Sequence, residues 1–197
     1  NLCVNQIHRW GSPEQKEKYL PALVSGEHLG ALAMSEAGAG SDVMGMRTTA
    51  VRDGDHYVLN GSKMWITNAP QADAMIIYAV TDPDASSRKL SAFIVERGAQ
   101  GLSTPQKLDK LGMRGSDTSE VLFEDCRVPV ENLIGREGTG FITAMKTFDA
   151  SRPGVGAQAL GIAQFDHFTG DAAQPRPSAE YPTGSPRIWV QPHPARS

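Results

Sequence analysis

The chain has 197 residues, of which 40% are hydrophobic and 21% are charged, and its formal net charge at pH 7 is −3. This length is enough for one large or two small folded domains, and the small acidic charge carries no signature of binding to nucleic acids or anionic membranes. Without an apolar run of about eighteen residues or a signal-peptide pattern, we expect a cytosolic protein that does not span a membrane. Cys3 and Cys126 lie far apart, show no metal-ligand spacing and are expected to be free, buried thiols.

The first part of the chain has helical periodicity. Asn1–Trp10 keeps apolar residues on one side, and because the chain starts with Asn rather than Met, we interpret it as the end of a helix whose beginning is missing. Further on, Ser12 and Gln15 have the spacing of a capping box, with a proline at the first helical position. This pattern predicts a second helix that ends at Gly26. Residues 1–28 are therefore expected to be largely helical.

Short β-like runs separated by turns follow over residues 29–135. The dipeptide Asn60-Gly61 between two such runs is a strong hairpin signal, and Asp53-Gly54-Asp55 marks another turn. Many short strands without βαβ alternation predict a central antiparallel β-sandwich or barrel rather than a Rossmann domain. The expected strands are Leu29–Met34, Thr48–Arg52, His56–Leu59, Lys63–Thr67, Ala74–Val80, Ser91–Glu96, Leu102–Leu108 and Ser119–Val128.

Helical spacing returns in residues 136–164 and predicts one helical stretch over Gly138–Gln164. Pro153 disturbs a helix, so Asp149 or Ser151 could cap a restarted helix behind it. The fold class expected from these segments is α+β.

The end of the chain has a different composition. Residues 165–197 are rich in proline and lose the periodic apolar pattern, with only Ile188-Trp189-Val190 able to pack. Such a stretch cannot bury enough apolar surface to offset the entropy of ordering its backbone, which predicts a disordered tail.

Two segments within the β region carry the candidate site. Ala33–Asp42 reads A-M-S-E-A-G-A-G-S-D, a small-residue loop whose glycines let a ligand approach the backbone closely. Lys63–Asn68 reads K-M-W-I-T-N, and on a strand Trp65 and Thr67 point to the same face, an apolar plate beside a hydroxyl. That pair suits a flat ring with polar edges. Taken singly, such a loop is more often an ordinary turn, and such a Trp is more often part of a core.

Together the two segments resemble the acyl-CoA dehydrogenase family of flavoproteins, in which a T/S-E-x-G-A-G-S-D loop and a K-M-W-I-T-N strand contact FAD. The resemblance runs from about Asn5 to Gln164 and includes Leu108–Thr118 and Val121–Pro129. It implies that residues 1–28 are the end of an N-terminal helical domain. It implies FAD as the cofactor and an acyl-CoA thioester as the substrate. The implied FAD-binding residues are Met34, Ser35, Gly40, Ser41, Trp65, Ile66 and Thr67, and Ser41 is also an implied substrate contact.

Asp149 and Arg152 allow two interpretations. Three residues apart on a helix, they share a face and form an ordinary intrahelical ion pair. Alternatively, the fork of Arg152 suits a ligand phosphate or carbonyl. The resemblance supports the second interpretation, because family members carry F-D-x-x-R-P here and use its Asp and Arg to contact coenzyme A. For Arg114, a structural role and a substrate contact both stay open.

The resemblance ends at Gln164, where family members continue into a long C-terminal helical bundle. We therefore expect a chain truncated after the middle β domain and the start of that bundle, through an altered reading frame or a truncated gene product. Most of the family draws its catalytic Glu from the bundle, and a minority carries it immediately before the Arg of F-D-x-x-R, where this chain has Ser151. The catalytic base is therefore unknown and expected to be absent from this chain.

The function implied by the resemblance is FAD-dependent α,β-dehydrogenation of an acyl-CoA thioester in fatty acid or amino acid catabolism. It also implies electron-transfer flavoprotein as the electron acceptor, and family members form homotetramers. The alternative is a non-catalytic remnant, or a module that binds FAD or acyl-CoA without turnover. An acyl-CoA oxidase is a third possibility that no residue distinguishes from a dehydrogenase.

Overall fold

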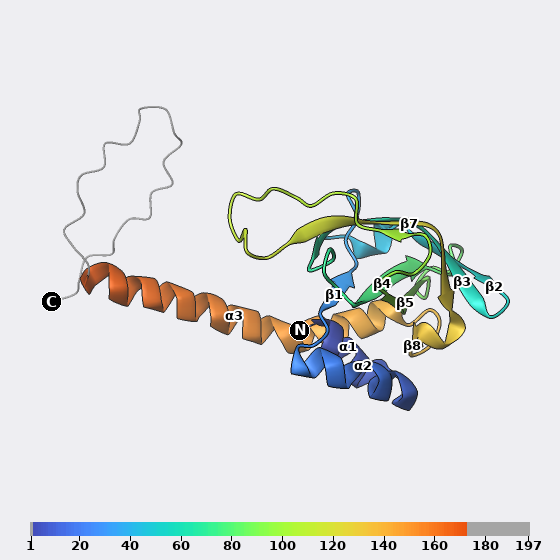
Figure 1. Ribbon diagram of the computed structural model, residues 1–197, viewed down its shortest axis with the longest axis horizontal. Coiled ribbons are helices and arrows are strands. Elements are labelled where there is room, and N and C mark those ends of the chain that lie inside the picture. Colours follow the sequence, from blue (N-terminus) through green and yellow to red (C-terminus); the bar gives the residue numbers. More distant parts are fainter. Residues whose placement is uncertain (1, 173–197) are drawn as a thin grey trace, which may run out of the picture. The chain divides into compact units, whose positions relative to one another are not determined.

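A computed structural model of the chain describes residues 2–172, and these divide between two compact units, Asn1–Gly154 and Val155–Ser197. The first unit holds two short helices, the whole β-sheet and the beginning of a third helix (Figure 1). The second unit contains the rest of that helix. The predicted fold class, α+β, is confirmed.

The N-terminal helices form as their sequence signals predict. Helix α1 spans Leu2–Trp10 and α2 spans Pro13–Ser25. The Ser12 hydroxyl accepts a hydrogen bond from the Gln15 backbone N–H, and the Gln15 side chain accepts one from the Ser12 N–H, which completes the capping box. Gly26 ends α2 in the left-handed conformation, with φ of 84°.

A single eight-stranded sheet follows, with the strand order β6-β7-β3-β2-β4-β5-β8, and β1 pairs with β4 off this path. Short 3₁₀ turns, η1 at Val43–Gly45 and η2 at Val130–Asn132, interrupt the connections. The strands are β1 (Gly30–Ala33), β2 (Thr49–Asp53), β3 (His56–Thr67), β4 (Ala74–Val80), β5 (Leu90–Glu96), β6 (Leu102–Ser103), β7 (Thr118–Pro129) and β8 (Leu133–Ile134).

The sheet is mixed rather than purely antiparallel, which corrects the prediction. Most neighbouring strands are antiparallel, but β1 runs parallel to β4 over Gly30–Ala33, and β2 meets the same strand in parallel at Thr49 and Val80. β1 and β2 therefore both pair with β4, and the long loop that joins β1 to β2 begins and ends beside β4. This arrangement places both ends of the loop at residues 34–48 beside one strand.

The hairpin predicted at Asn60-Gly61 is wrong. β3 runs through this dipeptide and pairs with β7 on both sides of it, with a register shift between Leu59 and Gly61. The two residues form part of a β-bulge instead. Gly61 has φ of 138°, and the Asn60 side chain forms hydrogen bonds with Asp125 on β7. The true hairpin joins β2 and β3 at the second predicted turn, where Gly54 has φ of 62°.

Two other boundaries differ from the prediction. The strand expected over Leu102–Leu108 has only the two residues of β6, and the rest is loop. Helix α3 spans Gly140–Ala172, so it continues through Pro153 without restarting and passes the boundary predicted at Gln164. Proline removes one backbone bond from a helix, but that loss is local and the turns on both sides remain helical. The predicted disorder of the remaining tail, residues 173–197, lies outside the described residues.

Two apolar clusters cover the two faces of the sheet. One lies among the strands and includes Ile77, Phe93 and Val121. The other includes Ile76, Tyr78 and residues of α1, α2 and the beginning of α3. All seven residues of β4 are buried, since alternate side chains enter different clusters.

Substitutions at Gly61, in the bulge, and Gly54, in the hairpin turn, test the topology of β2 and β3. A Cβ at Gly61 would lie 2.8 Å from the Thr48 Cα, whereas a Cβ at Gly54 would meet no atom within 4 Å. We expect Gly54→Ala to cost about 1 kcal/mol of unfolding free energy, from the left-handed backbone alone. Gly61→Ala adds a steric clash and should cost about 3 kcal/mol. Chemical denaturation of both variants measures the difference, and equal losses would contradict the close approach of Thr48.

Candidate functional site

A cavity of about 430 Å³ opens in the first unit between the loop after β1, strand β3 and the first turns of α3. Its lining combines small and polar loop residues with apolar side chains from the strand and the helix. The lining residues are Leu32, Met34, Ser35, Gly40, Ser41, Asp42, Val43, Met44, Trp65, Ile66, Phe141, Met145, Phe148 and Arg152.

The cavity gathers most of the site residues predicted from the sequence, although they come from three separate chain segments. The loop contributes four of them, Met34, Ser35, Gly40 and Ser41. The strand contributes Trp65 and Ile66, and α3 contributes Arg152. Thr67 and Asp149 are exposed and do not line the cavity. A common site is therefore formed without these two residues.

Both interpretations of Arg152 remain compatible with the structure. Its Nη1 lies 3.6 Å from Asp149 Oδ1, and both side chains are largely exposed. Such an exposed pair contributes little to stability. The guanidinium also lines the cavity, so it is available to an anionic or carbonyl-bearing ligand at the same time.

Trp65 has an unusual backbone. Its φ is 61°, in the left-handed region, where a bulky residue costs about 1–2 kcal/mol. The register of β3 against β7 shifts between Lys63 and Ile66, and this irregularity turns the indole outward while Ile66 stays buried in the sheet cluster. The Trp65 residue is 54% exposed. A strained backbone that exposes a large aromatic ring to a cavity is typical of a ligand platform.

The glycine-containing loop leaves open space. A Cβ added at Gly38 or Gly40 would meet no protein atom within 4 Å. Protein packing therefore does not require glycine at either position. The open space agrees with the prediction that a ligand approaches the backbone closely here. Gly40 is the better candidate of the two glycines because it lines the cavity.

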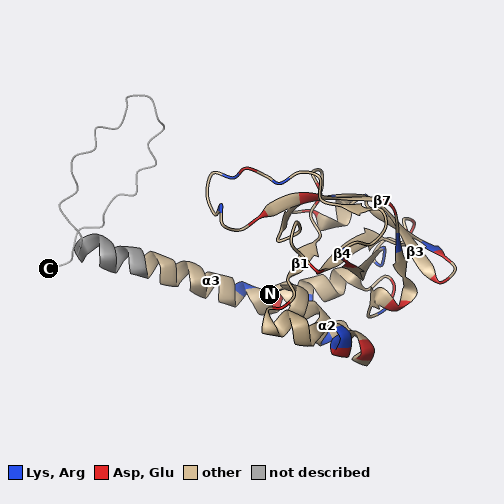
Figure 2. Ribbon diagram, viewed as in Figure 1, with Lys and Arg blue, Asp and Glu red and all other residues tan. Residues whose placement is uncertain are grey.

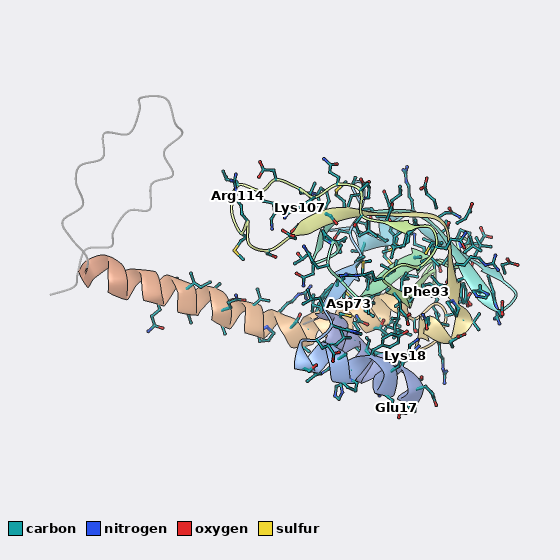
Figure 3. All side chains as sticks on the ribbon, in the orientation of Figure 1. Glu17, Lys18, Asp73, Phe93, Lys107 and Arg114 are labelled. Atoms are coloured by element: carbon teal, nitrogen blue, oxygen red, sulfur yellow. The ribbon has the colours of Figure 1, made fainter. Side chains whose placement is uncertain are left out.

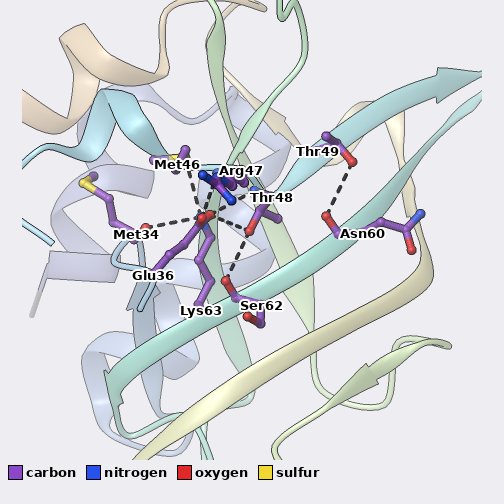
Figure 4. A network of polar contacts seen from close by, with 9 residues as sticks. All are labelled: Met34, Glu36, Met46, Arg47, Thr48, Thr49, Asn60, Ser62 and Lys63. Atoms are coloured by element: carbon purple, nitrogen blue, oxygen red, sulfur yellow. Dashed lines mark hydrogen bonds and ion pairs between the residues drawn. The ribbon is translucent and has the colours of Figure 1, made fainter. Parts of the chain in front are cut away.

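A buried ion pair lies beneath the loop (Figure 4). Lys63 is fully buried on β3, and its Nζ donates to Glu36 Oε1 at 2.8 Å and to the Met34 carbonyl at 3.2 Å. Glu36 also accepts from the Arg47 N–H at 2.7 Å, the Thr48 N–H at 3.0 Å and the Thr48 hydroxyl at 2.6 Å. The carboxylate thus joins the beginning and the end of the loop.

The protonation of the pair follows from its burial. Loss of hydration lowers the pKa of Lys63 to about 8, although the contact with Glu36 opposes this change. Burial alone would raise the pKa of Glu36, but the hydrogen bonds from Lys63, Thr48 and the Arg47 backbone outweigh it and place that pKa below its usual value. Glu36 is therefore an anion near neutral pH and is fully engaged.

Sequence reasoning missed this pair. Glu36 and Lys63 enter the sequence analysis only as members of two ligand motifs, because they lie 27 residues apart in the chain and no local pattern pairs them. Strand alternation gives no signal for the pair, because it places Lys63 on the same face as Trp65 and Thr67, whereas the register shift between Lys63 and Ile66 accompanies a buried Lys63 and an exposed Trp65. Asp42 and the apolar cavity residues of α3 were also not assigned to the site.

The loop before β7, which carries Lys107 and Arg114 (Figure 3), forms a separate cavity of about 350 Å³ lined by these two residues, Lys110 and their neighbours. Arg114 is held within its own loop: its Nε donates to the Lys110 carbonyl at 2.8 Å, and it lies 3.5 Å from Asp109. It does not line the first cavity. This arrangement favours the structural role over the substrate contact.

Surface charges of both signs are interspersed over the first unit (Figure 2). Within residues 2–172, no group of three or more His, Cys, Asp or Glu side chains is arranged to hold a metal ion. In the same part of the chain, no helix combines the length and apolar character needed to cross a bilayer.

Comparison with known proteins identifies the family. The family model described as "Acyl-CoA dehydrogenase, middle domain" matches residues 31–126, and "Acyl-CoA dehydrogenase, N-terminal domain" matches residues 1–27. The chain belongs to the acyl-CoA dehydrogenase family. The first match covers the sheet and the cavity loop, and the second covers α1 and α2.

Acyl-CoA dehydrogenase relatives are similar over most of this chain. Isovaleryl-CoA dehydrogenase of Arabidopsis thaliana mitochondria is 56% identical over 164 residues, which cover 83% of this chain and 40% of the relative. The structure of butyryl-CoA dehydrogenase from Megasphaera elsdenii is 47% identical with a TM-score of 0.80, over 83% of this chain and 43% of that one. A chain from a structure described as "Electron transferring flavoprotein of Acidaminococcus fermentans" is 48% identical with a TM-score of 0.80, over 82% and 43% of the two chains. The chain thus spans about 40% of the length of the curated relative.

The left-handed backbone of Trp65 predicts an unusual order of stability for two substitutions at this position. In most strand positions Gly is less stable than Ala by about 0.5–1 kcal/mol. At φ of 61° the order should reverse, so Trp65→Gly should be more stable than Trp65→Ala by about 1 kcal/mol. Urea denaturation of the two variants measures this difference.

Val58, on a regular part of the same strand, provides the matched control. There Val58→Ala should be more stable than Val58→Gly. If Ala were also preferred at position 65, the left-handed conformation of Trp65 would be contradicted.

Proposed function

We propose that this chain is the FAD- and acyl-CoA-binding part of an acyl-CoA dehydrogenase. The observation that carries the proposal is the cavity itself, which brings a glycine-containing loop, an outward-facing indole and an arginine to one place. Family membership indicates which chemistry such a cavity serves in longer relatives. The cavity indicates which residues of this chain would take part.

The residues present fit a flavin. Trp65 offers a flat apolar face, and the left-handed backbone that exposes it is a cost that ligand binding would explain. Ser35 and Ser41 offer hydroxyls and backbone groups to polar edges, and Gly40 leaves the backbone accessible. We propose that these residues, with Met34 and the backbone of Ile66, hold FAD. Thr67 is included by family resemblance alone.

The substrate would be held from the side of α3. Arg152 can bind a phosphate or carbonyl oxygen of an acyl-CoA thioester, with Asp149 beside it to orient the guanidinium. Phe141, Met145 and Phe148 give that wall an apolar surface suited to an acyl or pantetheine chain. Ser41 would contact the substrate or the phosphates of the cofactor.

The reaction requires a base as well as a cofactor. Bound FAD supplies a hydride acceptor, while a carboxylate must remove the proton next to the thioester carbonyl. Among the described residues that line the cavity, Asp42 is the only carboxylate. Glu36 is engaged by Lys63 and Thr48, and Ser151 stands where some relatives carry the catalytic Glu. We therefore propose that this chain binds both ligands but contributes no efficient base.

The proposed partners are based on family membership. We propose electron-transfer flavoprotein as the electron acceptor, because the similar Acidaminococcus fermentans structure is described by the name of such a flavoprotein, and a homotetramer for the assembled enzyme. The cytosolic location expected from the sequence stays a prediction, and the Arabidopsis thaliana relative is named as mitochondrial.

Flavin binding tests the cofactor assignment directly. We expect the purified chain to bind FAD, and Trp65→Ala to raise the dissociation constant roughly tenfold, because it removes the aromatic face. Titration with FAD, followed by quenching of flavin fluorescence, measures the constant. Val51→Ala removes an exposed apolar side chain from β2 outside the cavity and should leave binding unchanged. Equal affinity of Trp65→Ala and the unaltered chain would remove Trp65 from the site.

The proposed lack of a base predicts ligand binding without turnover. With FAD, a series of acyl-CoA thioesters and a dye acceptor, we expect dye reduction to be slower than in a complete enzyme by about two to four orders of magnitude. Arg152→Gln should still weaken acyl-CoA binding, measured by calorimetry. Rapid dye reduction would contradict the proposal, and its loss in Asp42→Asn would then assign the base to Asp42.

A further inference from the structure

The loop that lines the cavity starts and ends at the same place in the fold. β1 leaves the edge of β4 after Ala33, and β2 returns to that strand at Thr49. Between these points the chain carries seven of the cavity residues, all of them outside the β-strands and α-helices. What determines the shape of this loop therefore determines the shape of the site.

One carboxylate closes the loop. The Glu36 N–H and carbonyl form a tight turn with Ala39, while its side chain accepts the N–H groups of Arg47 and Thr48 at the far end. Its Oε1 also accepts a hydrogen bond from the Lys63 ammonium. The residues between these contacts include Gly40 to Met44, which supply five of the seven cavity residues of the loop.

Lys63 also orients the first peptide of the loop. Its ammonium is fully buried, so water cannot replace its protein partners, and it donates to the Met34 carbonyl. The next residue of β3, Met64, donates its N–H to the Ser35 carbonyl at 2.9 Å. The described chain has no cis peptide bond, so the Ser35 N–H points opposite to the Met34 carbonyl and away from Lys63. Ser35 lines the cavity.

We propose that the buried Lys63–Glu36 pair is the positioning device of the cavity: it closes the loop over residues 34–48 and directs the Ser35 N–H toward the ligand. Neither residue lines the cavity, so both act through the loop. This role has precedents, because a buried ion pair contributes little net stability compared with apolar replacements and in some proteins serves to specify one arrangement. The proposal rests on the proposed function only where it takes FAD as the ligand.

The loop can be tested without any ligand. Hydrogen exchange followed by mass spectrometry on the unliganded chain reports the Arg47 and Thr48 amides, which the pair protects. We expect Lys63→Met and Glu36→Gln to speed exchange in this segment at least about tenfold while β4 and β5 stay protected. If Lys63→Met does not fold, the double variant Lys63→Met/Glu36→Gln, which leaves no buried charge unpaired, carries the same test. Unchanged exchange in a folded variant would overturn the proposal.

Measurements of FAD affinity distinguish a role of the Lys63–Glu36 pair in positioning the loop from a role in the stability of the whole fold. We expect FAD to bind the folded double variant at least about tenfold more weakly, which corresponds to about 1.4 kcal/mol. Leu59→Ala is the matched control: it opens space in the sheet cluster on the same strand, so it should lower the melting temperature without changing flavin affinity or loop exchange. Unchanged affinity in the double variant would overturn the positioning role. If the unaltered chain binds no FAD, the proposed function fails, and the exchange experiment alone decides whether the pair holds the loop.

Discussion

The structure depends on the burial of β4 and β5 from both sides. β4 is buried at all seven positions and β5 at six of seven, so both faces of these strands must be covered, and the chain covers the two faces in different ways. The other strands provide one cluster, and α1, α2 and the beginning of α3 provide the second. The cavity lies where these two coverings meet, since Ile66 belongs to the first cluster and Met34 to the second. A site between the sheet and its helices is therefore a direct result of how the sheet is covered.

The polar groups under the cavity follow a different physical rule from the apolar clusters. Dispersion and hydrophobic burial tolerate many arrangements of similar volume, whereas a buried ammonium has few acceptable positions. The Lys63 ammonium donates to the Met34 carbonyl, to Glu36 Oε1 and to the Met46 sulfur, and all three acceptors belong to the loop over residues 34–48. Directional contacts of this kind hold an irregular segment that has no ladder of its own.

Local signals in the sequence predicted the local structure well. The capping box at Ser12 and Gln15, the turn at Gly54 and the apolar run of β4 depend on neighbours in the chain, and each forms as expected. The hairpin prediction at Asn60-Gly61 was wrong because β7, far along the chain, pairs with both halves of β3 and makes the dipeptide part of a bulge. The outward Trp65 and the buried Lys63 depend on that same long-range pairing. The proposed ligand residues could be found through a family motif, but the two residues beneath them needed the three-dimensional structure.

The separation of β3 from its partner β7 along the sequence also has a consequence during synthesis of the chain. β3 ends at Thr67 and β7 begins at Thr118, so the edge of β3 that β7 will cover stays open while the intervening segment is made. At ribosomal rates of about 5–20 residues per second, this wait lasts several seconds. An open, regular edge would invite pairing with another nascent chain. Gly61, a residue type that weakens a strand, interrupts this edge before β7 is made, whereas the bulges themselves form only when β7 pairs with β3.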